Sequence, residues 1–383
     1  MECRYYEMHS SSSTFDMKAN GSSIAVHPNP IIAGDITRII SSDIEWSRLA
    51  GCSVLIAGAA GFLPTYLVEV VMALWHHPAL TGNDPPRVIA LVRSEDRARA
   101  KFAHHLQNPG FTLLVQDVCT RLPAEIRPDF IVHAASPASP KYYRDDPVGT
   151  IGPNTVGTQH LLECAANVDA KGFLFFSSAE IYGDLPESMI PTRESDAGVL
   201  DPTDPRNCYA ESKRLGEALC IAWHRQFGVA ASIVRPFHVY GPGMRLDDGR
   251  VFADFAAAVV HGRDIALLST GTASRSFCYL ADATEGFFRI LLRGESGTAY
   301  NLGNPECEIS IAELAEILTA LYPEKGLQVI RAARKAEDPY MPSKVERSCP
   351  DIGRLRLLSW KPSIDIRTGF RRTIDSLSCG TLP

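Results

Sequence analysis

The sequence has no long hydrophobic run and no surplus of positive charge. No apolar stretch approaches the ~20 residues that a membrane-spanning helix requires. The segment from Met1 to Asn20 is polar and serine-rich, without the apolar core of a secretory signal. Lysine and arginine number 38 against 44 acidic residues, a net charge of −6, which gives no broad electrostatic footprint for nucleic acid or for an anionic membrane. We therefore expect a local pocket of basic side chains or backbone N–H groups to hold any anionic ligand.

Cysteine pairs with metal-binding or redox spacing are also missing. The ten cysteines are scattered, without CxxC pairs and without the Cys/His spacing of zinc sites. This spacing predicts no metal site. It also indicates reduced thiols and a cytoplasmic protein, in which most cysteines are small buried apolar residues.

The length and the apolar content allow a large core. With 383 residues, 45% of them apolar, the chain can form one or two domains. Residues 1–50 are expected to be an N-terminal extension, of which the first ~30 residues form a mobile tail because they are polar. The apolar spacing over Ile36–Leu49 predicts a helix that packs onto the body of the protein.

From Ser53 onward, apolar strands alternate with helical segments, which is typical of a parallel α/β sheet. The expected strands are Ser53–Ala57, Arg87–Leu91, Phe111–Val115, Phe130–His133, Phe173–Ser177 and Ala231–Arg235. The expected helices are Pro64–Trp75, Ala98–Leu106, Val148–Asn167 and Tyr209–Phe227. We therefore predict a doubly wound parallel sheet over residues 51–236. Residues 237–383, joined by 185–207, are expected to form a smaller C-terminal α/β lobe.

A glycine-containing turn follows the first strand. Gly58 and Gly61 allow a tight bend and a close approach of the backbone to a ligand. The N–H groups of such a turn and of the helix after it can bind a pyrophosphate, as in Rossmann dinucleotide-binding domains. The residues expected to contact a dinucleotide here are Gly58, Ala60, Gly61, Phe62 and Leu63. Pro64 replaces the third glycine of this pattern, in a helical turn that tolerates proline.

The second and third strands end in further candidates for cofactor binding. No acidic residue ends the second strand, where one usually binds the adenosine ribose; Arg93 stands there instead. Arg93 therefore leaves two interpretations open, a contact with the 2′-phosphate of NADP or a solvent-facing side chain beside NAD. Asp117, next to Val118, either bonds the adenine amino group or caps a turn.

A tyrosine and a lysine lie one helical turn apart at Tyr209 and Lys213, hence on one face of a helix. The ammonium group is expected to lower the tyrosine pKa and so make Tyr209 an acid/base for a hydroxyl group. Alone, such a pair is more often an ordinary surface pair. Upstream, however, a buried strand ends in Ser178, whose hydroxyl can hold the reacting group near Tyr209.

Together these segments resemble the extended short-chain dehydrogenase/reductase family of nucleotide-sugar epimerases, dehydratases and decarboxylases. The resemblance runs from about Ser53 to Ser376 and is strongest to the UDP-glucuronate decarboxylase branch. The segments that carry it, besides the turn and the Tyr-Lys pair, are His133–Pro140, Tyr240–Pro242, Leu246–Val251 and Arg275–Phe277.

The resemblance implies roles for individual residues. Tyr209, Lys213 and Ser178 match the catalytic triad, and Glu180 matches an acidic residue beside the sugar C5. Further implied cofactor contacts are Val118, Ala134, Ala135, Ser136 and Pro236; implied substrate contacts are Ser136, Asn154, Ala179, Arg250 and Arg275. Each polar candidate also has a purely structural interpretation: a buried paired carboxylate for Glu180, a rim salt bridge for Arg275, a plain turn for Arg250 and a helix-start residue for Asn154.

The resemblance also implies a reaction and partners. Bound NAD takes a hydride from sugar C4 and later returns it, and the transient ketone allows loss of a C6 carboxylate as carbon dioxide. Decarboxylation of a nucleotide-diphosphate sugar is the leading interpretation, and 4-epimerisation, dehydration or a non-catalytic dinucleotide sensor are alternatives. A 4,6-dehydratase is disfavoured because Ala179 stands where it has aspartic acid. A homodimer is implied, with Val148–Asn167 and Tyr209–Phe227 at the interface.

Overall fold

A parallel sheet of seven strands forms the centre of the protein. The computed structural model describes residues 27–80, 84–332 and 345–378, so most of the predicted N-terminal tail lies outside the described residues. Every pair of neighbouring strands in the sheet is parallel. Their order is β11 (Ala299–Leu302), β6 (Ala231–Pro236), β5 (Gly172–Phe176), β4 (Phe130–His133), β1 (Ser53–Ala57), β2 (Arg87–Val92) and β3 (Phe111–Val115).

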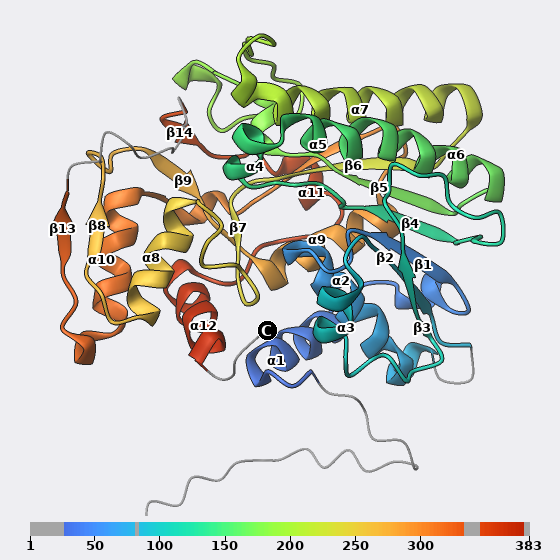
Figure 1. Ribbon diagram of the computed structural model, residues 1–383, viewed down its shortest axis with the longest axis horizontal. Coiled ribbons are helices and arrows are strands. Elements are labelled where there is room, and N and C mark those ends of the chain that lie inside the picture. The colour runs from blue at the N-terminus through green and yellow to red at the C-terminus, as the bar shows by residue number, and fades with distance from the viewer. Residues whose placement is uncertain (1–26, 81–83, 333–344, 379–383) are drawn as a thin grey trace, which may run out of the picture.

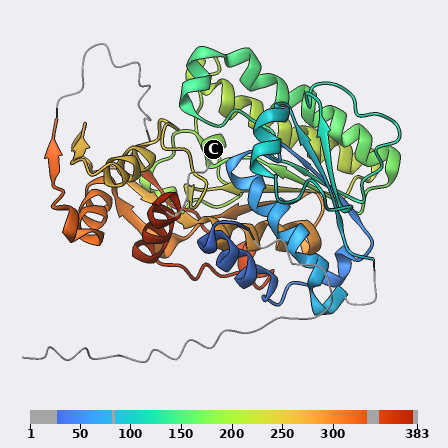
Figure 2. The same cartoon turned by 60° about the horizontal axis from the view of Figure 1, so that its bottom comes forward.

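Helices cover both faces of this sheet, which confirms the predicted doubly wound α/β fold (Figures 1 and 2). One face carries α4 (Pro140–Asp145), α5 (Pro147–Gly152), α6 (Thr158–Val168) and α7 (Cys208–Phe227). The other carries α1 (Pro30–Ile40), α2 (Phe62–Ala73), α3 (Glu95–Lys101) and α9 (Leu280–Arg293). Alternate residues of β1 serve the two cores: Val54 and Ile56 pack on the α2 side, whereas Leu55 and Ala57 pack on the α6 side. Since both faces are buried, the strands are apolar throughout.

A second, smaller layer of elements lies beside the sheet, at the left of Figure 1. Its helices are α8 (Val251–Val260), α10 (Ile311–Leu321) and α12 (Ile366–Ser378), whereas α11 (Gly353–Arg356) packs against β11 of the central sheet. Its strands are β7 (Val239–Tyr240), β8 (Ile265–Leu267), β9 (Ser274–Ser276), β10 (Cys278–Tyr279), β12 (Glu308–Ser310), β13 (Val329–Arg331) and β14 (Arg347–Ser348). Short helical turns complete the connections: η1 (Trp46–Leu49), η2 (Leu74–His76), η3 (Pro78–Leu80), η4 (Pro153–Gly157), η5 (Ala179–Tyr182), η6 (Glu187–Met189), η7 (Pro205–Asn207), η8 (Pro305–Cys307) and η9 (Pro323–Lys325).

Three expectations about elements need correction. The predicted helix over Ile36–Leu49 is two elements, α1 and η1. Helix α1 begins at Pro30, after its N-cap Asn29, and ends before a turn at Ser41 and Ser42, which separates it from η1. The predicted helix over Val148–Asn167 is three consecutive segments, α5, the π-helical η4 that begins at Pro153, and α6.

The predicted helix over Ala98–Leu106 is also displaced. It is the shorter α3, which begins at Glu95 and is followed by a chain of turns. The boundary at residue 236 stays a proposal; beyond it, β11 and α9 pack in the central sheet layers.

Two further expectations concern reduced cysteines and the lack of a membrane-spanning helix. Eight cysteines in the described part of the chain are free thiols. None of the described helices combines the length and the apolar character that a membrane crossing needs.

Candidate active site

The turn after β1 has the geometry of a phosphate-binding loop. Gly58 adopts a φ of +77°, and a side-chain carbon placed there would lie 2.7 Å from the Cα atom of Ala135, so only glycine fits. The N–H groups of Gly58 and Ala59 donate to the carbonyl of Leu91 at 2.9 and 3.3 Å, which fixes the loop against β2. Helix α2 then begins at Phe62 without a side-chain cap. Its first N–H groups are thus available to an anion, together with the helix dipole.

The remaining cofactor candidates follow the carboxyl ends of neighbouring strands, where parallel sheets bind ligands. Arg93 follows β2 and is exposed, and Ala134 to Ser136 follow β4. The hydroxyl of Ser136 is buried and has no hydrogen-bond partner among the described residues. An orphaned hydroxyl beside the Gly58 turn is what a site missing its ligand would show, so these residues fit a dinucleotide.

Asp117, which follows β3, has a structural partner. Its carboxylate accepts a hydrogen bond of 2.8 Å from the N–H group of Cys119, and so it caps a turn as its alternative interpretation expected. Because a carboxylate can accept several hydrogen bonds, this contact leaves a cofactor contact open. Val118 is buried beside it, and Pro236 ends β6.

Ser178, Tyr209 and Lys213 meet at the ends of β5 and α7. Tyr209 lies in the first turn of α7 and shares a side-chain hydrogen bond with Ser178. Lys213 lies one turn further, only 2% exposed, and its Nζ atom is 5.7 Å from the centre of the Tyr209 ring. The ammonium group donates to the carbonyl of Phe176 at 2.6 Å. The predicted Ser-Tyr-Lys arrangement is therefore present as one cluster.

The electrostatics of this cluster differ from the expectation. Burial, followed by the charge of Glu180, raises the pKa of Tyr209 above its ordinary value. Burial also lowers the pKa of Lys213 to about 7. The prediction that Lys213 lowers the tyrosine pKa is thus wrong for the chain alone, because the lysine charge is directed at a backbone carbonyl and is itself weakened by burial.

Glu180 lies in η5, two residues after Ser178, and the charges of three arginines act on it. Burial raises the pKa of this carboxyl group, and the charges of Arg206, Arg250 and Arg275 oppose that rise. Arg250 forms an ion pair with Asp248 and lies over the ring of Phe252. The site therefore combines a carboxyl group that gains protons easily with several cations, which suits an anionic substrate.

Two predicted substrate contacts have structural partners. Arg275 donates to the carbonyls of Ser274 and Val345, each at 2.7 Å. Asn154, fully buried in η4, donates to Thr150 and to the hydroxyl of Ser212, each at 3.0 Å. Asn154 thus joins η4 to α7, while its side-chain oxygen is buried without a partner among the described residues. Ala179 begins η5 and presents no polar side-chain group.

Sequence reasoning missed three residues of the site. Tyr143 of α4 stacks on Tyr209 with ring centres 4.8 Å apart. Arg206 acts on Glu180, and its Nε atom is buried without a partner among the described residues. His238 follows β6, and burial and the charges of Arg275 and Arg250 lower its pKa. Arg206 could have been predicted as a site residue, because it stands three residues before Tyr209 in the sequence. Tyr143 and His238 come from separate parts of the chain, and no local pattern connects them with the site.

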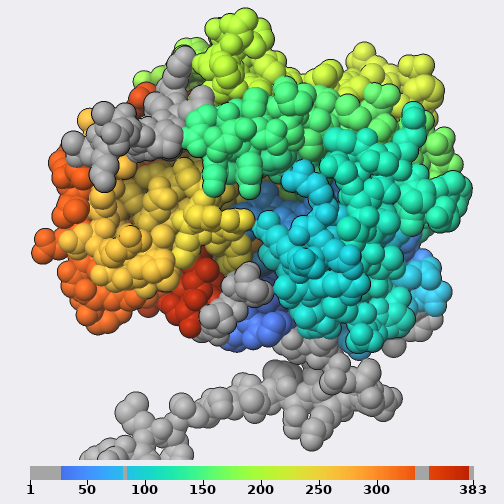
Figure 3. All heavy atoms as spheres, in the orientation of Figure 1, coloured from blue at the N-terminus to red at the C-terminus, as the bar shows by residue number. Residues whose placement is uncertain are grey.

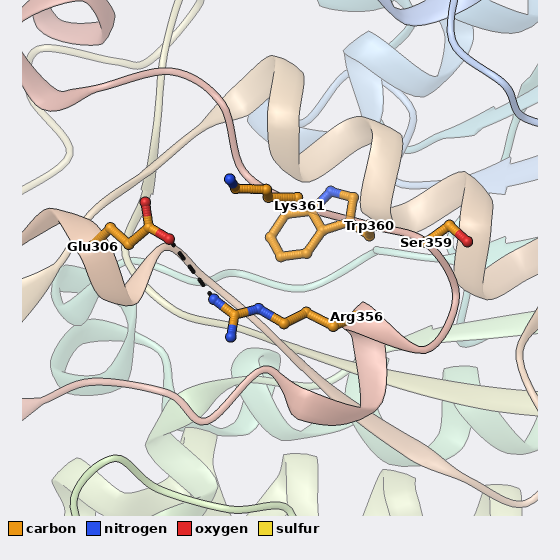
Figure 4. A pocket seen from close by; sticks show the side chains of 5 residues that line it. All are labelled: Glu306, Arg356, Ser359, Trp360 and Lys361. Atoms are coloured by element: carbon orange, nitrogen blue, oxygen red, sulfur yellow. Dashed lines mark ion pairs between the residues drawn. The ribbon is translucent and has the colours of Figure 1, made fainter.

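Figure 3 shows a hollow in the surface between the smaller layer, coloured yellow, and the helices of the sheet, coloured green and cyan. A different pocket, lined by Glu306, Arg356, Ser359, Trp360 and Lys361, shares no residue with the site (Figure 4). There Arg356 pairs with Glu306 at 3.8 Å, and Trp360 donates to the carbonyl of Asp282. Since this pocket contains none of the residues that surround Tyr209, we do not assign the chemistry to it.

Comparisons with known proteins place the chain among its relatives. UDP-glucuronic acid decarboxylase 6 of Arabidopsis thaliana is 34% identical over 318 residues, covering 83% of this chain and 86% of that protein. UDP-glucuronic acid decarboxylase 1 of Xenopus tropicalis is 33% identical, covering 84% and 71%.

Solved structures show the same fold. UDP-glucose 4-epimerase of Thermotoga maritima aligns with a TM-score of 0.70 at 19% identity, covering 85% of this chain and 98% of that one. UDP-glucuronic acid 4-epimerase of Bacillus cereus aligns with a TM-score of 0.69 at 22% identity, covering 85% and 99%. The model of the NAD dependent epimerase/dehydratase family matches residues 54–303. The chain therefore belongs to the NAD dependent epimerase/dehydratase family, with NAD as its cofactor.

Proposed function

We propose that this enzyme removes the C6 carboxylate of a nucleotide-activated uronic acid as carbon dioxide, by transient oxidation at C4. The observation that carries the proposal is the site itself: a Ser-Tyr-Lys cluster beside a half-buried glutamate on which the charges of three arginines act. The 34% identity to UDP-glucuronic acid decarboxylases supports the same reaction.

The cluster supplies acid/base chemistry at the sugar C4 hydroxyl. Bound NAD would accept the C4 hydride and return it later, and its positive charge would favour ionised Tyr209. Tyr209 then takes the hydroxyl proton while Ser178 holds the oxygen, which leaves a C4 ketone. Lys213, tied to Phe176, is placed to hold the nicotinamide ribose.

The ketone makes loss of carbon dioxide possible. The C5–C6 bond breaks, its electron pair forms an enolate over C5 and C4, and carbon dioxide leaves. C5 then needs a proton, and Glu180 is the acid we assign, because its raised pKa keeps the protonated form available. Arg206, Arg250 and Arg275 would neutralise the diphosphate and the uronate carboxylate. Ala179 offers no acid to expel a C6 hydroxyl group, which disfavours dehydration.

The first experiment identifies the cofactor and the product. The protein is denatured, its released cofactor is identified by mass spectrometry, and the native enzyme is incubated with UDP-glucuronate. NAD with a UDP-pentose and carbon dioxide would support the proposal; NADP would favour the phosphate interpretation of Arg93. Formation of UDP-galacturonate would replace the proposal by 4-epimerisation, and cofactor without any turnover of nucleotide sugars would favour a dinucleotide sensor.

A variant of Glu180 tests the assigned acid. Glu180→Gln should suppress deuterium incorporation at C5 in D₂O while NADH formation from C4 oxidation stays detectable by absorbance. Glu187→Gln, an exposed carboxylate in η6, serves as the control. Equal loss of both steps in Glu180→Gln would remove its special role.

We also propose that two copies associate through α5, η4 and α7. Five large apolar side chains are exposed on these elements: Val148, Ile151, Val156, Leu215 and Phe227. Ile151 and Leu215 line one shallow pocket between α5 and α7. Exposed apolar side chains gathered in this way mark interaction surfaces.

A further inference from the structure

Three histidines and a glutamate meet away from the active site. His27 lies three residues before the start of α1, Glu69 lies in the middle of α2, and His104 and His105 lie in the turns after α3. Figure 1 shows α1, α2 and α3 close together at its lower centre. Because Glu69 comes about two helical turns after the Gly58 loop, the cluster is roughly 10 Å along α2 from the dinucleotide end.

The distances within this cluster are compatible with a metal site. The Nε2 atom of His104 is 3.1 Å from both carboxylate oxygens of Glu69. Ligand atoms of His27, Glu69 and His104 all lie within 4.8 Å of one another. Around a tetrahedral zinc ion, with metal–ligand distances near 2.0–2.1 Å, neighbouring ligand atoms are roughly 3.3 Å apart. Small rotations of these side chains therefore suffice for coordination.

His105 supports the cluster without joining the three. Its Nε2 atom is 2.9 Å from the Oε2 atom of Glu69, and its side chain is 4% exposed. A hydrogen bond to one carboxylate oxygen leaves the other oxygen for the metal, as outer partners of metal sites do. The Nδ1 atom of His105 is buried without a partner, so the hydrogen bond to Glu69 is the one that this imidazole makes among the described residues.

We propose that His27, Glu69 and His104 bind a divalent transition metal ion of the zinc class. The bound ion would fasten the chain before α1 to the sheet domain. Coordination by either nitrogen of His27 ends the hydrogen bond that its Nδ1 atom accepts from Asn29, because the imidazole then has no free acceptor there. The spacing of cysteines and histidines did not predict this site, since its ligands come from three separate segments.

The test is metal binding by the full chain, first stripped with a chelator. Equilibrium dialysis against zinc chloride, and visible absorption of the cobalt(II) form, should show one saturable site per chain. The double variant His27→Ala/His104→Ala should bind more than about 100-fold more weakly and lose the tetrahedral cobalt bands, and His105→Gln should bind about 10- to 100-fold more weakly. His76→Ala, which removes an exposed histidine, is the matched control.

Thermal unfolding gives a second measurement on the same proteins. Zinc should raise the Tm of the wild type and of His76→Ala, and leave that of the double variant unchanged. Circular dichroism establishes that each variant is folded before it is compared. Metal uptake without saturation, or equal affinity in the double variant, would overturn the proposal.

Discussion

The ring of Tyr209 stacks on the ring of Tyr143. Its hydroxyl group can therefore be removed while the ring stays in place. Tyr209→Phe should therefore keep the fold and NAD binding but lose about 10²- to 10⁴-fold in kcat, the usual contribution of a positioned acid/base. Steady-state turnover and NAD titration measure the two properties. Tyr142→Phe, an exposed neighbour, is the control. A wild-type rate in Tyr209→Phe would refute the assignment.

Lys213 makes the stability of the NAD-free protein depend on pH. Its pKa is about 7 in the fold against 10.5 in the unfolded chain, so between these values the unfolded chain binds more protons and stability rises with pH. Lys213→Met cannot titrate. The difference between the free energies of unfolding of the wild type and of Lys213→Met should therefore increase, in favour of the wild type, by up to about 1.4 kcal/mol per pH unit in this window. Denaturant titrations at pH 7, 8 and 9 measure the difference; a constant difference contradicts the assigned pKa.

Among elements, the turn from β1 to α2 depends most on a single backbone conformation. Gly58→Ala combines a positive φ with a clash against Ala135, whereas Gly228→Ala, at φ +73°, meets nothing within 4 Å. Both variants should incur the roughly 1–2 kcal/mol of left-handed strain. Only Gly58→Ala should also lose NAD affinity, by about tenfold or more, which corresponds to about 1.4 kcal/mol. Isothermal titration with NAD compares them, and equal affinities would argue against the loop as the pyrophosphate site.

The elements that sequence predicted best are those with an unbroken apolar run. Strands such as Phe130–His133 are buried on both faces, and their boundaries match the prediction. β11 was missed because its apolar run is interrupted by Asn301, a buried polar residue that donates to the carbonyls of Thr192 and Asp351 and accepts from the hydroxyl of Tyr182. Such partners are set by tertiary structure and leave no local pattern.

The same distinction holds for the site. Tyr209, Lys213 and Ser178 belong to short motifs with fixed spacing, so sequence could name them and the structure brings them together. Tyr143 and His238 enter only through packing of α4 and of the segment after β6. The pKa of Tyr209 was mispredicted because helix spacing gives the distance to Lys213, but not the carbonyl of Phe176 toward which Lys213 points.

At the scale of the whole molecule, the proposed pairing of two copies depends on the apolar face of α5 and α7. Leu215→Glu would place two unpaired carboxylates in that interface. The loss of about 2 kcal/mol or more expected at such a position corresponds to about 30-fold weaker association. Light scattering after size-exclusion chromatography should show a dimer for the wild type and a monomer for Leu215→Glu. Leu357→Glu, an exposed leucine on another face, is the control; a monomeric wild type would refute the proposal.

Helices α1 and α12 hold the two ends of the described chain together. Asp35, 1% exposed, accepts hydrogen bonds from Tyr66 and Tyr279 and pairs with Arg372 at 2.6 Å. Asn29 donates to the carbonyl of Ser376 at 2.8 Å. During translation, the carboxylate of Asp35 leaves the ribosome 337 residues before its cation. The nascent chain therefore cannot complete the charge environment of α1 until Arg372 has emerged.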